Sequence, residues 1–270
     1  MATIQSPEVH IEEIPLLPAS VTSVETAIPA FIGYTQKAQS QVADDLLFLP
    51  KKISSILEYE QYFGLSFLET GITVSIDTTI PGNIHAVASI KKSSHYKMHY
   101  GLQLFFANGG GPCYIVSVGG YTPKPGIKAA DLKKGLHAIT IVAEITLICF
   151  PDAMHLSTAA SYYGVFKKAM IQCAELKDRF TIMDVWINTK APIDNIQVLR
   201  NFNFGGTEML KYAAAYYPRI YTVLNHAYEE ISIKIKATGD KSLSGNLAQL
   251  QLTTNASYLL AKKQLLICRF

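Results

Sequence analysis

Apolar side chains recur along most of the chain with the spacings of buried strands and amphipathic helices. Two short apolar runs, residues 28–34 and 114–118, predict buried strands. Residues 56–63, 96–107 and 129–139 predict three helices. Strands that alternate with helices in this way favour a fold of the α/β class, with some α+β elements.

The clearest part of the pattern is a strand–helix–strand unit in the middle of the chain. A strand over residues 141–150 is followed by a helix over 158–177, whose apolar residues repeat every three or four positions, and by a strand over 180–186. Ser157 is a suitable N-cap for the helix. This order and spacing predict a right-handed βαβ unit with parallel strands.

Shorter elements follow. We expect a helix over residues 193–203, a strand over 213–217 that Pro218 ends, and a half-exposed strand over 231–236, where apolar and polar residues alternate. An amphipathic helix over 247–266 closes the pattern, with its basic residues late, as the helix dipole prefers. Together the elements predict a mixed sheet flanked by helices.

The first 25 residues do not follow the pattern of a compact domain. Prolines exclude a continuous helix, while Val9 and Ile11 alternate with polar residues as in a strand. The segment is either a frayed terminus or an arm that adds a strand to another subunit's sheet. We therefore divide the chain into an extended arm (1–25) and an α/β core (26–270), in which residues 66–94 form an irregular hairpin or a small insertion.

Composition narrows the function classes. Only 17% of the residues are charged and 49% are hydrophobic, which suits burial against neighbouring subunits and a large monomeric core equally well. A net charge of +3 without a basic stripe argues against nucleic-acid binding. The chain begins without a secretory signal, and its longest apolar stretch, residues 138–150, is too short to cross a bilayer. We expect a soluble protein made in the cytoplasm.

Two motifs invite a chemical interpretation but are better explained by structure. The glycine-rich residues 108–112 follow a helix and precede a strand, whereas a phosphate loop lies at the amino end of a helix. We interpret them as a helix cap and a tight turn. His95 and His99 have the spacing of paired metal ligands, but the sequence offers no third ligand. We interpret them as surface histidines near the start of a helix.

Asp152 is the remaining candidate for a reactive group. It follows the strand that ends at Phe150, where open α/β sheets often place functional residues. Aspartate is also common where a helix begins, and no serine or cysteine nucleophile accompanies it. The sequence thus offers no assembled catalytic set, metal site or cofactor site, and we predict a protein that is not an enzyme. The alternative is a small-molecule-binding or hydrolytic α/β enzyme with a deep pocket at Asp152.

Six segments of the chain resemble the sheath proteins of contractile phage tails and of pyocin-like and antifeeding-prophage-like particles. Their order, across residues 7 to about 265, makes the resemblance specific. The segments are PEVHIEEIP (7–15), VETAIPAFIGY (24–34), FFANGGGPCYIV (105–116), LICFPDA (147–153), CAELKDRF (173–180) and KYAAAYYP (211–218).

The resemblance implies a tail-sheath-like core and a structural function. Sheath proteins form stacked rings around an inner tube and shorten on firing, which drives the tube through a target envelope. Their terminal arms add strands to the sheets of neighbouring subunits, which gives Val9, Ile11 and Ile14 the role of inter-subunit contacts. The implied partners are other sheath subunits in a helical homo-oligomer, the inner tube protein, and baseplate and terminator proteins. The particle would assemble in the cytoplasm and could be released from the cell.

The end of the chain departs from the family pattern. Sheath proteins usually continue past the last helix into a segment that completes the tube-proximal domain and supplies a C-terminal arm. The sequence here stops at residues 265–270, which are largely apolar. We therefore expect the C-terminal sheath segment to be absent, which would leave the acceptor sheet for an incoming arm incomplete.

Overall fold

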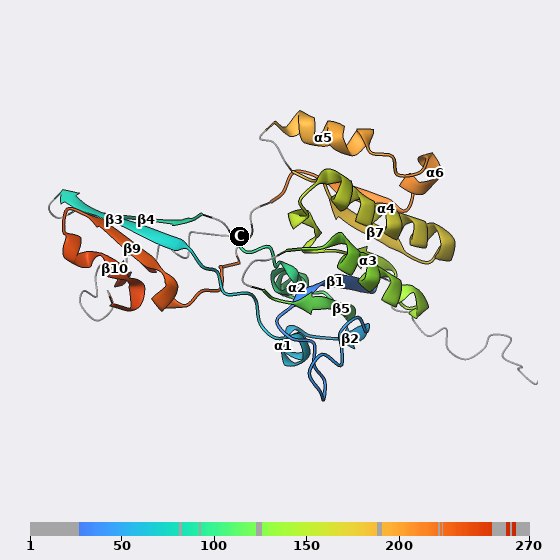
Figure 1. Cartoon of the computed structure of the whole chain (residues 1–270), viewed down its shortest axis with the longest axis horizontal. Helices are drawn as coiled ribbons and strands as arrows, with labels where there is room; N and C mark the ends of the chain where they lie inside the picture. Colours follow the sequence, from blue (N-terminus) through green and yellow to red (C-terminus); the bar gives the residue numbers. More distant parts are fainter. Residues whose placement is uncertain are drawn as a thin grey trace, which may run out of the picture.

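The computed structural model describes residues 27–80, 83–91, 93–122, 126–187, 191–220, 222, 224–249, 258–259 and 261–262. Within them the chain forms a six-stranded sheet and a four-stranded sheet, which lie side by side (Figure 1). We call the first sheet with its helices the large unit, and the second with the segments packed on it the small unit. The predicted arm, with Val9, Ile11 and Ile14, lies outside the described residues.

The large unit is built on a mixed sheet in the order β2-β5-β1-β6-β7-β8. Strand β2 runs antiparallel to β5, and every other neighbouring pair is parallel, which confirms the predicted fold class. The strands are β1 (Pro29–Thr35), β2 (Lys51–Ile53), β5 (Cys113–Gly120), β6 (Leu147–Cys149), β7 (Phe180–Asp184) and β8 (Ala213–Tyr216).

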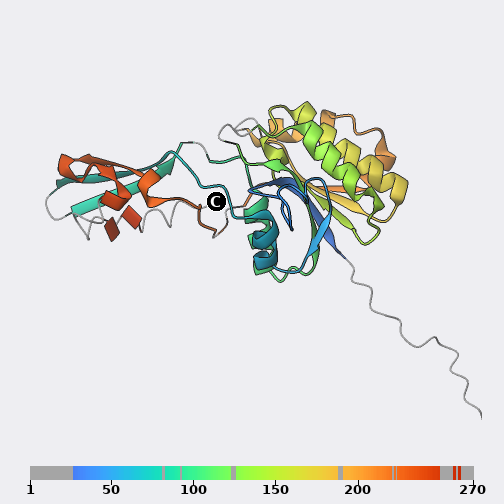
Figure 2. The same cartoon turned by 60° about the horizontal axis from the view of Figure 1, so that its bottom comes forward.

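Helices cover both faces of this sheet (Figure 2). They are α1 (Ile56–Phe63), α2 (Met98–Ala107), α3 (Ala129–Ala138), α4 (Ala159–Leu176), α5 (Pro192–Asn201) and α6 (Thr207–Leu210). Ile32 of β1 packs in a core with α3 and α4, whereas its neighbour Phe31 packs in a second core with α1 and α2. Because successive side chains of a strand point to opposite faces, a central strand covered on both sides must be apolar throughout. All of β1 is buried accordingly.

The predicted helix boundaries agree closely with the structure. The Ser55 side chain accepts a hydrogen bond from the Glu58 N–H at the start of α1, and Gly64, with a φ of +81°, ends this helix. Helix α4 begins one residue later than predicted, because Thr158 rather than Ser157 accepts the capping hydrogen bond. The β6–α4–β7 unit has the predicted parallel strands, with Leu147 opposite Phe180.

The strand predicted over residues 141–150 is mostly wrong, because β6 covers only Leu147–Cys149. The preceding residues form a 3-10 turn, and Ile141 is 90% exposed. Arg179 stabilises this turn: its guanidinium donates hydrogen bonds to the carbonyls of Ile139 (3.0 Å) and Val142 (3.1 Å). A side chain distant in sequence therefore provides hydrogen-bond donors to the backbone carbonyls of this turn.

The small unit contains β3 (Ile72–Ile80), β4 (Asn83–Ile90), β9 (Lys234–Thr238) and β10 (Gly245–Asn246), in the order β10-β9-β3-β4. Strands β3 and β4 form a hairpin, one of the two alternatives predicted for residues 66–94, and β9 lies parallel to β3. Its apolar face, which includes Val74 and Ile235, packs with Tyr258 and Ala261. The predicted helix over 247–266 lies largely outside the described residues.

Candidate functional site

The chain reverses direction across the large sheet at β1 and β6. From β1 it moves outward to β5 on one side, then crosses back to β6 and continues outward through β7 and β8 on the other. In open α/β sheets, ligands bind at the carboxyl ends of the strands at such a switch point. Asp152, which follows β6, lies at this position, as the sequence predicted.

The Asp152 carboxylate caps helix α2 from another part of the fold. Its Oδ2 accepts a hydrogen bond from the Tyr34 N–H (2.7 Å), and its Oδ1 accepts from the N–H groups of Lys97 (2.5 Å) and Met98 (3.2 Å). Lys97 is the N-cap residue of α2, and its own side chain forms no capping hydrogen bond. A carboxylate at a helix N-terminus stabilises the unpaired N–H groups and the helix dipole.

This arrangement leaves the Asp152 carboxylate itself inaccessible to a ligand. Asp152 is fully buried, and burial raises the pKa of its carboxyl to about 6, although the three backbone N–H groups and Lys97 act in the opposite direction. A Cβ on Gly33 would lie 2.5 Å from Asp152 Oδ2. With its carboxylate buried and bound to three backbone N–H groups, Asp152 is a structural residue here.

The interpretation of both histidines as surface residues is wrong for His99, which is only 4% exposed. Its Nε2 lies 3.0 Å from Glu60 Oε1. His95 lies before α2 and stacks on the His155 ring, with centroids 4.6 Å apart. The two histidines thus face different partners, and no group of three potential metal ligands occurs within the described part of the chain.

The glycine-rich segment is a helix end and a turn, as predicted. Gly109 has a φ of +84°, and the Gly110 N–H donates to the Phe105 carbonyl at the end of α2. Strand β5 begins directly afterwards, at Cys113. A phosphate-binding role for residues 108–112 thus has no support from the geometry.

The structure reveals a different candidate site at the edge strand β8. Among the described residues, no strand pairs with its outer side. The N–H groups of Thr181 and Val185 on the β7 side donate to the carbonyls of Tyr212 and Tyr216. Tyr212 and Tyr216 therefore direct their backbone groups toward β7. Because a residue in a parallel ladder directs its N–H and C=O to the same side, Ala213 and Ala215 direct theirs outward.

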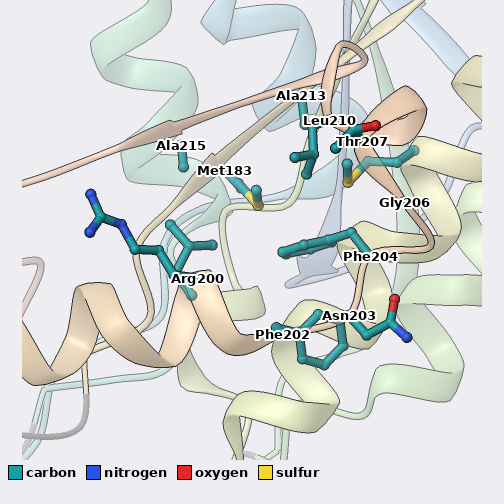
Figure 3. Close-up of a pocket in the computed structure, with 12 residues that line it drawn as sticks. Met183, Arg200, Phe202, Asn203, Phe204, Gly206, Thr207, Leu210, Ala213 and Ala215 are labelled. Carbon is teal, nitrogen blue, oxygen red and sulfur yellow. The ribbon is translucent and has the colours of Figure 1, made fainter.

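An apolar groove of about 490 Å³ lies beside this edge. Figure 3 shows side chains from α4, α5, α6 and the connecting loop around it. The apolar side chains that line it are Met170, Met183, Leu199, Phe202, Phe204 and Leu210. Arg200 and Thr207 also contribute to the lining. A strand edge with outward backbone groups and an adjacent apolar groove has the features that accept an extended peptide.

Sequence reasoning predicted β8 but not its edge position. The run Ala213–Tyr216 contains three alanines, whose small side chains leave the backbone accessible. Such a run is a weak signal, because an edge strand is defined by the order of strands in the sheet and not by its own residues.

Searches of protein families and of curated proteins found no match to the sequence. Among the described residues, no helix is long and apolar enough to span a membrane.

Solved structures give matches at low identity. One chain of the anti-feeding prophage (AFP) baseplate in its contracted state matches with a TM-score of 0.52 and 19% identity, over 83% of this chain and 50% of that chain. One chain of the AFP helical sheath in its contracted state matches with a TM-score of 0.41 and 23% identity, over 81% of this chain and 47% of that chain. At a TM-score of 0.41 the second match adds nothing to the first.

The chain spans about half the length of these two structures' chains. The identities are too low to transfer the role of any single residue. The fold of this chain is thus shared with a chain of the AFP baseplate, which agrees with the predicted resemblance to proteins of antifeeding-prophage-like particles.

Proposed function

We propose that this protein is a structural subunit of a contractile injection-system or phage-tail sheath. In this proposal it polymerises around an inner tube and shortens to drive the tube through a target envelope. The fold shared with a chain of the AFP baseplate and the six sequence segments that resemble sheath proteins support it. Its partners would be further copies of itself, the inner tube protein, and baseplate and terminator proteins.

The observation that carries the proposal is the open edge of β8 with its apolar groove. In the segment 7–15, Val9 and Ile11 alternate with polar residues, and Ile14 follows. A strand with this pattern would pair with the outward backbone groups of Ala213 and Ala215 while Val9 and Ile11, which share one face of the strand, enter the groove. The arm of one copy would thereby bind the large sheet of another.

Electron microscopy tests the proposal. The protein is co-expressed with the inner tube protein, and the product is examined by negative stain. We expect rings or tubes, which deletion of residues 1–14 abolishes without lowering the melting temperature of the isolated subunit. Monomers alone at high protein concentration in the presence of the tube protein would contradict the proposal.

A matched pair of substitutions tests the groove. Leu210, which is 51% exposed, lines it, whereas Leu57, which is 74% exposed, lies on α1 and does not. Both leucines are on helix surfaces, so a lysine at either position should change folding little. We expect Leu210→Lys to prevent assembly and Leu57→Lys to permit it. Equal assembly of the two variants would show that the β8 groove does not bind the arm.

A further inference from the structure

Three segments of the chain connect the large and small units. Their described residues lie within 64–71, 91–97 and 217–233, and each segment contributes to the surroundings of one buried carboxylate, that of Glu69, which is 1% exposed. Its Oε2 accepts a hydrogen bond from the Ser94 N–H (2.6 Å), and its own N–H donates to the Ala227 carbonyl (2.7 Å). One residue thus joins all three segments at the junction of the two units.

The junction is also attached to the large unit. The Ala227 N–H donates to the hydroxyl of Tyr100 on α2 (2.9 Å), and His226 Nδ1 lies 3.6 Å from Glu69 Oε1. Buried, hydrogen-bonded polar groups of this kind fix the geometry around them, because each loses its partner if a segment moves. The relative position of the segments at the junction is therefore well defined.

A second cavity, of about 660 Å³, lies at this junction. The small unit contributes Ile90, at the end of β4, and the returning segment contributes His226. The large unit contributes residues that follow the carboxyl ends of its strands, including His155 after β6 and Arg219 after β8. Cavities between two units and at the carboxyl ends of parallel strands are the common location of ligand sites in α/β proteins.

The charged groups that line the cavity are mainly cationic. Lys97 and Arg219 contribute two positive charges, against the single carboxylate of Asp184 among the lining residues. Burial lowers the pKa of Lys97 to about 8, and the nearby Arg219 lowers it further, although Glu69 and Asp152 act in the opposite direction. A pair of neighbouring cations in a partly buried cavity is stabilised by an anion that approaches both.

We propose that this junction cavity binds an oxyanion, a phosphate or carboxylate group, through Arg219 and Lys97. The planar guanidinium of Arg219 suits two-point contact with such a group, and Lys97 supplies a compact charge. The rest of the ligand would contact the apolar wall that Ile90 contributes from the small unit. A bound ligand would therefore touch both units and hold them together. This inference goes beyond the proposed function and does not depend on assembly.

Thermal denaturation of the dilute, unassembled protein tests the proposal, with inorganic phosphate and with glutarate as separate probes. We expect at least one probe to raise the melting temperature by about 3 °C at a tenfold excess over its Kd. Chloride at the same ionic strength controls for screening. The probe should also slow hydrogen exchange at the amides of Ser94 and Ala227, which belong to the junction.

Two variants and a control separate a specific site from a general salt effect. Arg219→Gln should abolish the shift, whereas Arg200→Gln, which removes an exposed arginine from the β8 groove, should leave it intact. Asp184→Asn removes the competing carboxylate and should tighten binding about threefold. A shift that Arg219→Gln leaves unchanged, or the absence of a shift with both probes, would overturn the proposal.

Discussion

The centre and the edge of the large sheet differ in whether their backbone N–H and C=O groups have hydrogen-bond partners within the subunit. At the centre, between β1 and β6, three backbone N–H groups converge on Asp152 and are satisfied in full. At the edge, Ala213 and Ala215 direct their backbone groups away from the sheet, beside an apolar groove. The difference indicates that the centre contributes stability to the subunit, whereas the edge is available to a partner. Substitutions at the two places should therefore affect different measurements.

The largest effect on stability is expected for Asp152→Ala. This change leaves the N–H groups of Tyr34, Lys97 and Met98 without their acceptor, and at least two of them are in buried surroundings. We expect the free energy of unfolding to fall by about 3–5 kcal/mol. Urea denaturation measures this loss, and Asp240→Ala, which removes an exposed turn carboxylate, should cost less than about 1 kcal/mol. Equal losses would show that Asp152 does not anchor α2.

A smaller loss is expected for Gly33→Ala. The added Cβ would lie 2.5 Å from Asp152 Oδ2 and 2.9 Å from Met98 Cε, so the carboxylate and α2 would have to shift. We expect a loss of about 1–3 kcal/mol. The matched control is Gly164→Ala on α4, where the nearest atom is 3.9 Å away and alanine should stabilise the helix by up to about 1 kcal/mol. A neutral Gly33→Ala would contradict the tight packing at the sheet centre.

The pH dependence of stability provides a third test of the centre. Burial raises the pKa of Asp152 from 3.8 to about 6 in the folded protein. A raised folded pKa contributes stability that is present below pH 3.8 and is lost as the pH rises through 6. Asp152→Asn cannot titrate, and its amide group faces an N–H donor, so it should be less stable than the wild type at pH 4. The stability gap should narrow by about 2–3 kcal/mol between pH 4 and 6. A constant gap would show that Asp152 keeps an ordinary pKa.

The smallest effect is expected at the edge. Ala215→Pro removes an outward N–H that the sheet does not use, so it should change the free energy of unfolding by about 1 kcal/mol or less. The N–H of Ala214 faces β7, and Ala214→Pro should cost about 3 kcal/mol. Thermal denaturation of both variants checks this difference. Similar losses would mean that the outward direction of Ala215 is wrongly assigned.

Local patterns in the sequence predicted local structure well. The serine and glycine that bound α1, the apolar run of β1 and the repeat of α4 each depend on neighbouring residues only. The position of Asp152 after a strand of the large sheet was predicted as well.

Features that depend on distant residues were not predicted. The hydrogen bond from Tyr34 to Asp152 joins positions 118 residues apart, and the half-buried Glu60 is a partner for the buried His99 across 39 residues. The turn before the short β6 contains carbonyls that accept hydrogen bonds from the guanidinium of Arg179, a contact that no pattern near residue 141 reveals. The β8 groove requires the order of the strands, which depends on the complete fold.

The parallel pairing of β3 with β9 has a consequence for the order in which the protein folds. Thr73 lies opposite Lys234, so this sheet joins parts of the chain that leave the ribosome far apart in time. The β3–β4 hairpin can form early, but an isolated hairpin is at best marginally stable. Pairing at such sequence separation is slow, because a long loop must close first. During synthesis, the large unit can therefore fold before β9, the third strand of the small unit, has been made.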